Sequence, residues 1–231
     1  MNNFVFSKKI ARLIILQRIE LLNLFQKKIR KLFGRYAFGN FFLYFLINKK
    51  KIQEKYFTLM ENEYKLLKDE IQCSNKKFLS IGGGVGGFEL IINKSTNNNF
   101  FCFIEKNYVS KKIIYGWDKK NLEAYNDLLL VRNFLLENGM KSEQFEIFDY
   151  DKQKLPEKKF DLIISLYSLD YHYDFSIYID YLKKVSHKRT KIIFDTIRSE
   201  HFKKIFKNVK IIQSQDFTVH KSKRIVCNEF I

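Results

Sequence analysis

Proline is nearly absent from this chain, whose 231 residues include one proline and nine glycines. Flexible linkers and low-complexity segments are rich in both residues, so the sequence predicts neither. Cysteine is scarce too: Cys73, Cys102 and Cys227 are odd in number and show no C-x-x-C spacing. They do not support a disulfide framework or a zinc knuckle, and a reducing cytoplasm is the expected compartment.

Long apolar runs are also lacking. The longest uninterrupted run, residues 41–47, falls far short of the roughly 20 residues that a membrane-spanning helix needs. Near the N-terminus, the apolar residues 13–16 are followed by Gln17, Arg18 and Glu20 without a cleavage site of small residues. We therefore expect no transmembrane segment and no signal peptide.

Acidic residues are few in the first quarter of the chain. Residues 1–55 hold thirteen Lys and Arg against two acids, and they supply most of the net charge of +17. A general enrichment in Lys, Asn, Ile and Phe accounts for part of this excess. A basic, amphipathic front segment can meet anionic lipid, nucleic acid or an acidic substrate, and the sequence leaves these partners open.

Helical spacing dominates the N-terminal region. Apolar residues recur at helical intervals across residues 7–33, which predicts one amphipathic helix or two. Gly34 and Gly39 interrupt the chain before an apolar segment that starts at Phe41 and a Glu/Lys-rich helix over residues 53–71. Because no linker follows, we expect residues 1–56 to form a helical extension that packs against a domain of residues 57–231.

Strand and helix patterns alternate after residue 77. Strands are predicted at 78–81, 100–104, 144–148, 160–166 and 191–194, and helices at 87–93, 121–138 and 178–185. This alternation predicts an α/β fold with a Rossmann-like, mostly parallel sheet and helices on both faces. Two further strands, 209–213 and 224–230, predict a C-terminal antiparallel hairpin.

The most informative stretch is KFLSIGGGVGGFEL, residues 77–90. Five of the nine glycines fall within residues 82–87, between a predicted strand and a predicted helix. Glycine permits positive φ and has no Cβ, so backbone N–H groups at the helix start can closely approach an anionic or hydroxyl-rich cofactor. The order of strand, glycine loop and helix predicts a nucleotide-type cofactor site, and the alternative is a tight turn without a ligand.

These motifs resemble those of class I S-adenosylmethionine-dependent methyltransferases over residues 57–231. The family's first motif, a strand running into G-x-G-x-G, matches Gly82, Gly84 and Gly86, and its ribose-binding acid matches Glu105. The acid near the adenine matches Asp149, and residues 160–169 resemble the fourth motif. The resemblance implies that S-adenosylmethionine is the cofactor and that these residues bind it: Ser80, Gly82, Gly83, Gly84, Gly86, Glu105, Lys106, Phe148, Asp149, Ser165 and Leu166.

A second kind of cofactor fits part of the same pattern. A carboxylate accepts two hydrogen bonds from a ribose diol, so Glu105 at a strand end suits a methyltransferase and a dinucleotide-binding dehydrogenase alike. Gly82, Gly84 and Gly87 also spell G-x-G-x-x-G. The fourth motif and the terminal hairpin favour the methyltransferase. The sequence departs from the family pattern at Ser80, two residues before the first glycine. Many members of the family have an acid there, whereas Ser80 offers only a neutral hydrogen bond.

Residues 165–173 bring Ser, Tyr, Asp and His together at the predicted carboxyl end of a strand, where open α/β sheets bind ligands. His172, with an ordinary pKa of about 6.5, is the candidate general base for an acceptor hydroxyl, and the alternative is a structural histidine. Asp170 either orients His172 or is solvated, and we favour solvation. Candidate acceptor-binding residues are Tyr167, Ser168, Tyr171, Tyr173, Asp195 and Arg198. The alternative for the tyrosines is a role in packing, and the alternative for Asp195 and Arg198 is a surface salt bridge.

The wider spelling of residues 165–182 resembles methyltransferases of bacterial surface-glycan and sugar modification, which implies O-methylation of a sugar or other small hydroxyl acceptor. Two functions stay open beside it: a methyltransferase whose basic N-terminus holds RNA or another polyanion, and a non-catalytic or NAD-binding Rossmann protein. No metal is expected, because the four histidines show no paired ligand spacing. The expected location is cytoplasmic, with contact at the inner face of the membrane as an alternative.

Overall fold

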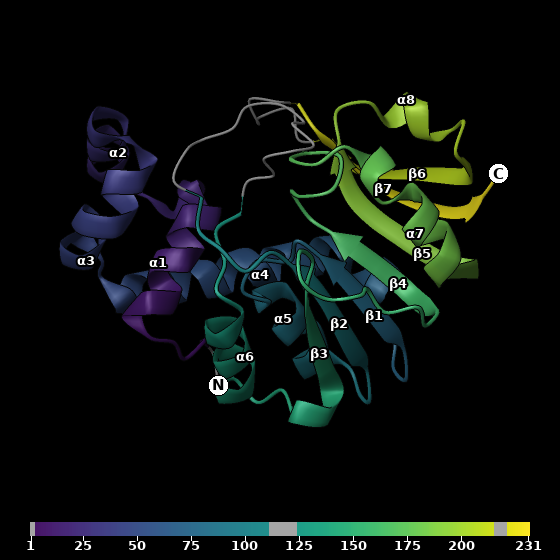
Figure 1. Cartoon of the computed structure of the whole chain (residues 1–231), viewed down its shortest axis with the longest axis horizontal. Helices are drawn as coiled ribbons and strands as arrows, with labels where there is room; N and C mark the ends of the chain where they lie inside the picture. Colours follow the sequence, from purple (N-terminus) through teal and green to yellow (C-terminus); the bar gives the residue numbers. More distant parts are fainter. Residues whose placement is uncertain (1–2, 111–123, 215–220) are drawn as a thin grey trace.

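The computed structural model describes residues 3–110, 124–214 and 221–231 of the chain. The strands in these residues are β1 (Lys77–Ile81), β2 (Phe100–Glu105), β3 (Phe145–Asp149), β4 (Phe160–Ser165), β5 (Ser186–Thr196), β6 (Phe206–Ser214) and β7 (Lys223–Phe230). They form one sheet in the order β3-β2-β1-β4-β5-β7-β6 (Figure 1). Strands β1 to β5 run parallel, while β7 is antiparallel to β5 and β6. The expected Rossmann-like sheet with a C-terminal antiparallel hairpin is confirmed.

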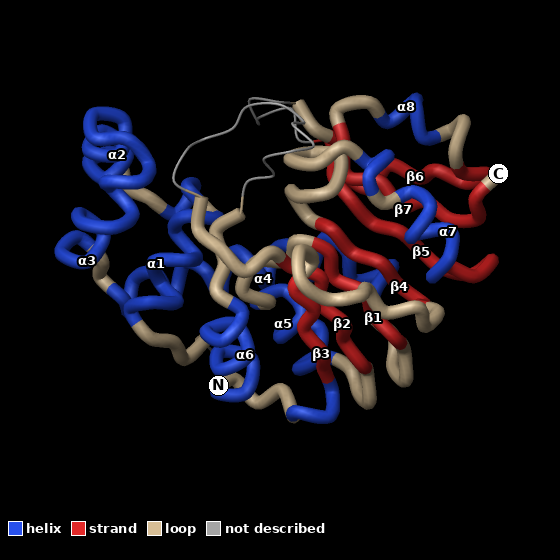
Figure 2. The backbone as a smooth tube through the Cα atoms, in the orientation of Figure 1, coloured by secondary structure: helices blue, strands red, loops and turns tan. Residues whose placement is uncertain are grey.

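Helices cover both faces of this sheet, because strand side chains alternate between two separate cores. On β1, Phe78 joins one core and Leu79 joins the other; on β2, Phe101 and Cys102 divide in the same way. The first core also contains residues of α5 (Gly87–Ser95) and α6 (Leu128–Glu137), and the second contains residues of α7 (Ile179–Val185) and α8 (Ser199–Phe202). Figure 2 shows the strands as a central layer between helices.

The N-terminal region folds into several helices, and residues 7–33 fall in two α-helices, the second alternative that the spacing left open. Helix α1 (Lys8–Gln17) begins at Ser7, whose hydroxyl accepts the Ile10 N–H at 3.3 Å, and the chain leaves the helical conformation at Arg18. Helix α2 (Leu24–Ala37) then runs into a π-helical turn over Phe38–Phe42, a short α3 (Leu43–Leu46) and the long α4 (Lys49–Ile71). The expected boundary at residue 56 lies inside α4.

Helices α1 and α4 pack on the sheet's first core. Ile14 of α1 and Leu67 of α4 are fully buried in that core. Helices α2 and α3 lie farther out, at the end of the molecule opposite the hairpin strands (Figure 1). Among the described helices, none is both long enough and apolar enough to cross a membrane.

Two elements differ from the sequence-based expectation. Strand β5 begins at Ser186 rather than at 191, because α7 ends at Val185 and the chain pairs at once with Phe160. Helix α6 begins at Leu128 rather than at 121, because the Asp127 carboxylate accepts the Leu130 N–H at 3.1 Å and caps the helix there. Residues 124–127 are therefore not helical, and the remaining predicted positions, 121–123, lie outside the described residues.

Candidate functional site

A cleft opens at the carboxyl ends of β1, β2 and β4, where the order of the strands reverses direction around β1 and β4. The glycine loop forms its floor. Gly82 and Gly84 have φ of 65° and 69°, the left-handed region that glycine alone adopts without strain. A Cβ on Gly82 would collide with the Ser168 side chain, and one on Gly84 would lie 2.5 Å from Gln17 Oε1. Side chains from two other segments therefore rest directly on this backbone.

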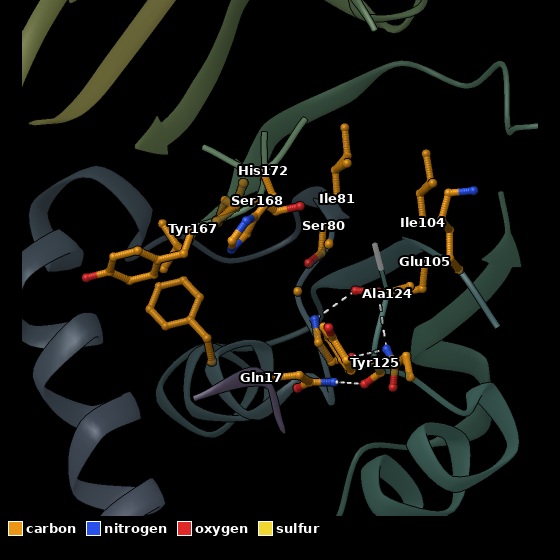
Figure 3. Close-up of a pocket in the computed structure, with 18 of the residues that line it drawn as sticks. Gln17, Ser80, Ile81, Ile104, Glu105, Ala124, Tyr125, Tyr167, Ser168 and His172 are labelled. Atoms are coloured by element: carbon orange, nitrogen blue, oxygen red, sulfur yellow. Dashed lines mark hydrogen bonds between the residues drawn. The ribbon is translucent and has the colours of Figure 1, made fainter. Parts of the chain in front are cut away.

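Glu105 ends β2 at one side of the cleft, and its carboxylate is already oriented (Figure 3). Its Oε1 accepts the Gly84 N–H at 2.7 Å, and its Oε2 accepts Asn126 Nδ2 at 3.2 Å. The same Asn126 amide donates to the Gly84 carbonyl at 2.8 Å. Burial raises the pKa of Glu105 to about 8, although both hydrogen bonds favour the charged form. The site thus holds a desolvated acid whose orientation is fixed by the glycine loop.

A second buried carboxylate, which the sequence did not reveal, belongs to Glu89 in the first turn of α5. Glu89 is 2% exposed, and its Oε1 accepts the Ser80 hydroxyl at 2.5 Å. Its Oε2 has no hydrogen-bond partner within the described part of the chain. Burial raises the pKa of this group as well. A carboxylate therefore lies beside the neutral Ser80, and it belongs to the helix that follows the glycine loop.

The end of α1 also contributes to the cleft. Gln17 Nε2 donates to the Tyr125 carbonyl at 2.7 Å, the hydrogen bond drawn beside the two labels in Figure 3. The guanidinium of Arg18 lies 4.8 Å from the ring centre of Tyr167. No local pattern marks these two residues, and the family resemblance does not extend to them. The cleft is therefore completed by residues from the basic N-terminal region.

A buried ion network supports the opposite wall. Tyr167 adopts φ of 57° directly after β4, and its N–H donates to Asp195 Oδ2 at 2.9 Å. Arg224, which is fully buried, binds Asp195 at 3.0 and 3.1 Å and also pairs with Glu63 of α4. Burial alone lowers the pKa of Arg224, but the two carboxylates raise it above its ordinary value. The Arg224 guanidinium lies 5.2 Å from the centre of the Tyr167 ring, which Arg18 also approaches.

His172 is exposed at the mouth of this wall, beside Ser168 (Figure 3). Its backbone N–H donates to the Ser168 carbonyl at 2.7 Å, and its ring meets Tyr171 edge to face at 5.0 Å. Both interpretations of Asp170 were wrong. Asp170 is 1% exposed, and its carboxylate binds Arg198 and the Thr196 hydroxyl, each at 2.5 Å, rather than solvent or His172.

The cleft gathers many of the residues selected from the sequence, but not all. Those that line it are Ser80, Gly82, Gly83, Gly84, Glu105, Lys106, Leu166, Tyr167, Ser168, His172 and Tyr173. Those outside the lining are Gly86, Phe148, Asp149, Ser165, Tyr171, Asp195 and Arg198. Residues that the sequence missed include Gln17, Arg18, Tyr56, Met60, Phe88, Glu89, Asn126, Tyr150 and Tyr178.

The outlying residues have structural partners of their own. Gly86 precedes α5 with φ of 82°. The Ser165 hydroxyl donates to the Ile81 carbonyl at 2.7 Å and accepts the Leu169 N–H at 2.9 Å, which joins β4 to β1. Asp149 accepts the Asp151 N–H at 3.1 Å, within the turn that follows β3. In the described residues, no three His, Cys, Asp or Glu side chains gather as a metal-binding group.

No family model matches this sequence, and no curated protein matches it. Among solved structures, a protein assigned as an O-methyltransferase from Nostoc punctiforme aligns with a TM-score of 0.50 and 12% identity, over 76% of this chain and 58% of that one. A ribosomal protein L11 methylase from Lactobacillus delbrueckii subsp. bulgaricus gives 0.49 and 9%, over 77% and 79%. An S-adenosylmethionine-dependent methyltransferase from Mesorhizobium loti gives 0.39 and 18%, over 58% and 53%.

The likeness to the first structure shows a shared fold, a Rossmann-like fold that this O-methyltransferase also has. At 12% identity it extends to the fold alone, and this chain spans little more than half the length of that protein. The chemistry must therefore be argued from the cleft itself.

Proposed function

We propose that the protein is an S-adenosylmethionine-dependent methyltransferase that methylates a hydroxyl of a sugar or another small acceptor. The observation that carries this proposal is the carboxylate of Glu105, held by Gly84 and Asn126 at the end of β2. It stands across the switch-point cleft from the segment that bears His172. A ribose-binding acid and an acceptor-side base would then face one space between them.

The residues present fit the cofactor. Glu105 offers acceptor oxygens for a ribose diol, and Gly82 and Gly84 adopt positive φ in the loop beside it. Tyr150 and Tyr178 offer ring faces near the end of β3, with Lys106 beside them, and we keep Phe148 and Asp149 as adenine-side candidates. When bound, S-adenosylmethionine supplies an electrophilic methyl group on a sulfonium.

Glu89 supplies the carboxylate that many family members carry at the position of Ser80. Glu89 Oε2 is buried in the cleft lining and has no partner among the described residues, and an unpaired buried carboxylate oxygen is costly. An ammonium group is the cation that would satisfy it, and the amino-acid end of the cofactor carries one. Arg18 lines the same cleft with the opposite charge and suits the carboxylate of that amino-acid end.

We assign acceptor binding and proton removal to the segment after β4. His172 would take the proton from the acceptor hydroxyl as the oxygen attacks, which is a common role for a histidine near neutral pH. Tyr167, Ser168 and Tyr173 line the cleft beside it, and Tyr171 contacts the His172 ring. Asp195 and Arg198 would position the acceptor-binding residues rather than touch the acceptor. Asp195 accepts the Tyr167 N–H, and Arg198 binds Asp170.

Calorimetry with S-adenosylmethionine, its demethylated product and NAD tests the proposal. We expect both sulfur ligands to bind and NAD to bind at least about tenfold more weakly. Glu105→Ala should weaken product binding by about 10- to 100-fold, because charge-assisted hydrogen bonds contribute about 1.5–3 kcal/mol. The matched control is Glu137→Ala, an exposed glutamate at the end of α6 that should leave binding unchanged. Tight NAD binding without any response to the sulfur ligands would reject the assignment.

A further inference from the structure

The surface of α2 and α3 exposes an unusual number of large apolar side chains. Among the described residues of this region, seven such side chains are between 45% and 79% exposed. We call them, with the lysines described below, the α2–α3 surface. The seven are Leu24, Phe25, Leu32, Phe33, Phe41, Tyr44 and Phe45.

Three of the apolar members, Phe33, Phe41 and Phe45, are joined by ring contacts through Phe42. Phe33 and Phe41 both meet the ring of Phe42, at 4.6 and 5.3 Å, and Phe41 meets Phe45 at 5.5 Å. Phe25 and Leu32 are seven residues apart on α2 and therefore share one helix face. Contiguous exposed apolar surface of this kind marks an interaction site.

The charge of the same segment has one sign. Residues 21–53 contain eight Lys and Arg and no acidic residue. Three of these lysines, Lys27, Lys28 and Lys31, are exposed on α2, and three more, at positions 49–51, are exposed at the start of α4. Aromatic rings and cations are thus interleaved on a part of the molecule that projects away from the sheet (Figures 1 and 2).

We propose that the α2–α3 surface docks the protein on an anionic lipid bilayer, independently of the methyltransferase assignment. The phenyl rings enter the interface between headgroups and acyl chains, and the lysines stay at headgroup level beside lipid phosphates. Apolar burial and charge attraction act together in such a contact. Neither contribution alone explains why a highly exposed apolar surface is surrounded by cations and lacks acids.

Charge argues against a second copy of the chain as the occupant. In a two-fold symmetric dimer the same surface faces itself, so cations would meet cations with no acid from residues 21–53 to pair them. RNA fits the lysines but not Leu24 and Leu32, which offer neither hydrogen bonds nor a ring on which a base can stack. An anionic bilayer satisfies both the charge and the apolar side chains.

Vesicle sedimentation of the full chain tests the proposal. We expect the protein to bind vesicles of phosphatidylcholine with about 30% phosphatidylglycerol and to bind pure phosphatidylcholine at least about tenfold more weakly. Two variants separate the contributions. Phe41→Ser with Phe45→Ser should weaken binding at least about tenfold, and Lys27→Gln with Lys31→Gln should weaken it about 25-fold, or roughly fivefold for each lysine.

Matched controls replace similar residues elsewhere on the surface. Leu129→Ser with Ile197→Ser removes two exposed apolar side chains, and Lys203→Gln with Lys204→Gln removes two exposed lysines. Neither control should change vesicle binding by more than about twofold. Equal losses in the control variants would overturn the proposal, as would wild-type protein that ignores anionic vesicles. A dimer that dissociates in the Phe41 and Phe45 variant, or RNA binding without vesicle binding, would overturn it in favour of that occupant.

Discussion

The Ser80 hydroxyl donates a 2.5 Å hydrogen bond to Oε1 of Glu89, and this contact joins the end of β1 to the first turn of α5. A serine thus holds in place the carboxylate that the strand itself lacks. The other carboxylate oxygen has no hydrogen-bond partner among the residues that the structure describes. The carboxylate beside Ser80 therefore belongs to the helix rather than to the strand.

Glu89→Gln should reveal what this oxygen binds. We expect the affinity for S-adenosylhomocysteine to fall about 10- to 100-fold, because one charged hydrogen-bond partner is lost. Binding of 5′-methylthioadenosine, which has no amino-acid end, should stay within about twofold. Calorimetry with both ligands measures the difference. Equal losses for the two ligands would mean that Glu89 acts only on the shape of the cleft.

Glu105 should make ligand binding depend on pH. Burial raises its pKa to about 8, so below that pH the side chain in the free protein is mostly protonated. A ribose diol donates hydrogen bonds to the carboxylate, so binding requires loss of this proton. The affinity for S-adenosylhomocysteine should therefore rise between pH 6 and 8, by at most about tenfold per pH unit.

The same titration in Glu105→Gln identifies the group responsible. The amide carries no ionisable proton, so the slope between pH 6 and 8 should become smaller even though binding is weaker throughout. A wild-type affinity that stays constant or falls over this range would contradict the assignment of Glu105 as the ribose acceptor.

His172→Ala should separate chemistry from binding. Once an acceptor is identified, turnover should fall by about 10²- to 10⁴-fold, because general-base catalysis typically contributes that much. Affinity for S-adenosylhomocysteine should remain within about twofold. The exposed His201 provides the matched control, since His201→Ala should change neither quantity. Loss of ligand affinity or of thermal stability in His172→Ala would instead assign the histidine a structural role.

Arg224→Met should strongly reduce the free energy of unfolding. The substitution keeps an extended apolar side chain but leaves Asp195 and Glu63 buried without their shared cation. Removing one member of a buried ion pair costs about 3–5 kcal/mol, and denaturant unfolding measures the loss. Arg189→Met, at an exposed position of β5, should change stability by less than about 0.5 kcal/mol. A similar small effect at Arg224 would show that the network contributes little.

The sequence predicted the centre of the sheet well because β1, β2 and β4 are short and largely apolar. It also located Glu105, since that residue follows directly from the end of a strand one unit beyond the glycine loop. It missed Gln17 and Arg18, which reach the cleft only because α1 folds back over the glycine loop. Contacts of this kind depend on tertiary packing and leave no local pattern.

Asp170 is a second residue whose environment depends on tertiary packing. Its sequence neighbours suggested a surface loop, but its partner Arg198 lies between β5 and α8, 28 residues later. A buried charge is stable only beside such a partner, so its burial cannot be inferred from residues 165–173 alone. The end of β2 at Glu105 could be predicted locally, whereas the charge pair of Asp170 and Arg198 could not.

The buried cluster of Arg224, Asp195 and Glu63 has a consequence for how this protein can change over evolutionary time. Its members come from β7, β5 and α4, so they are distant in the gene although they touch in the fold. A lineage that replaces one of these residues keeps an uncompensated buried charge until the other two are replaced as well. Among divergent relatives, positions 63, 195 and 224 should therefore be inherited together or exchanged together for apolar residues.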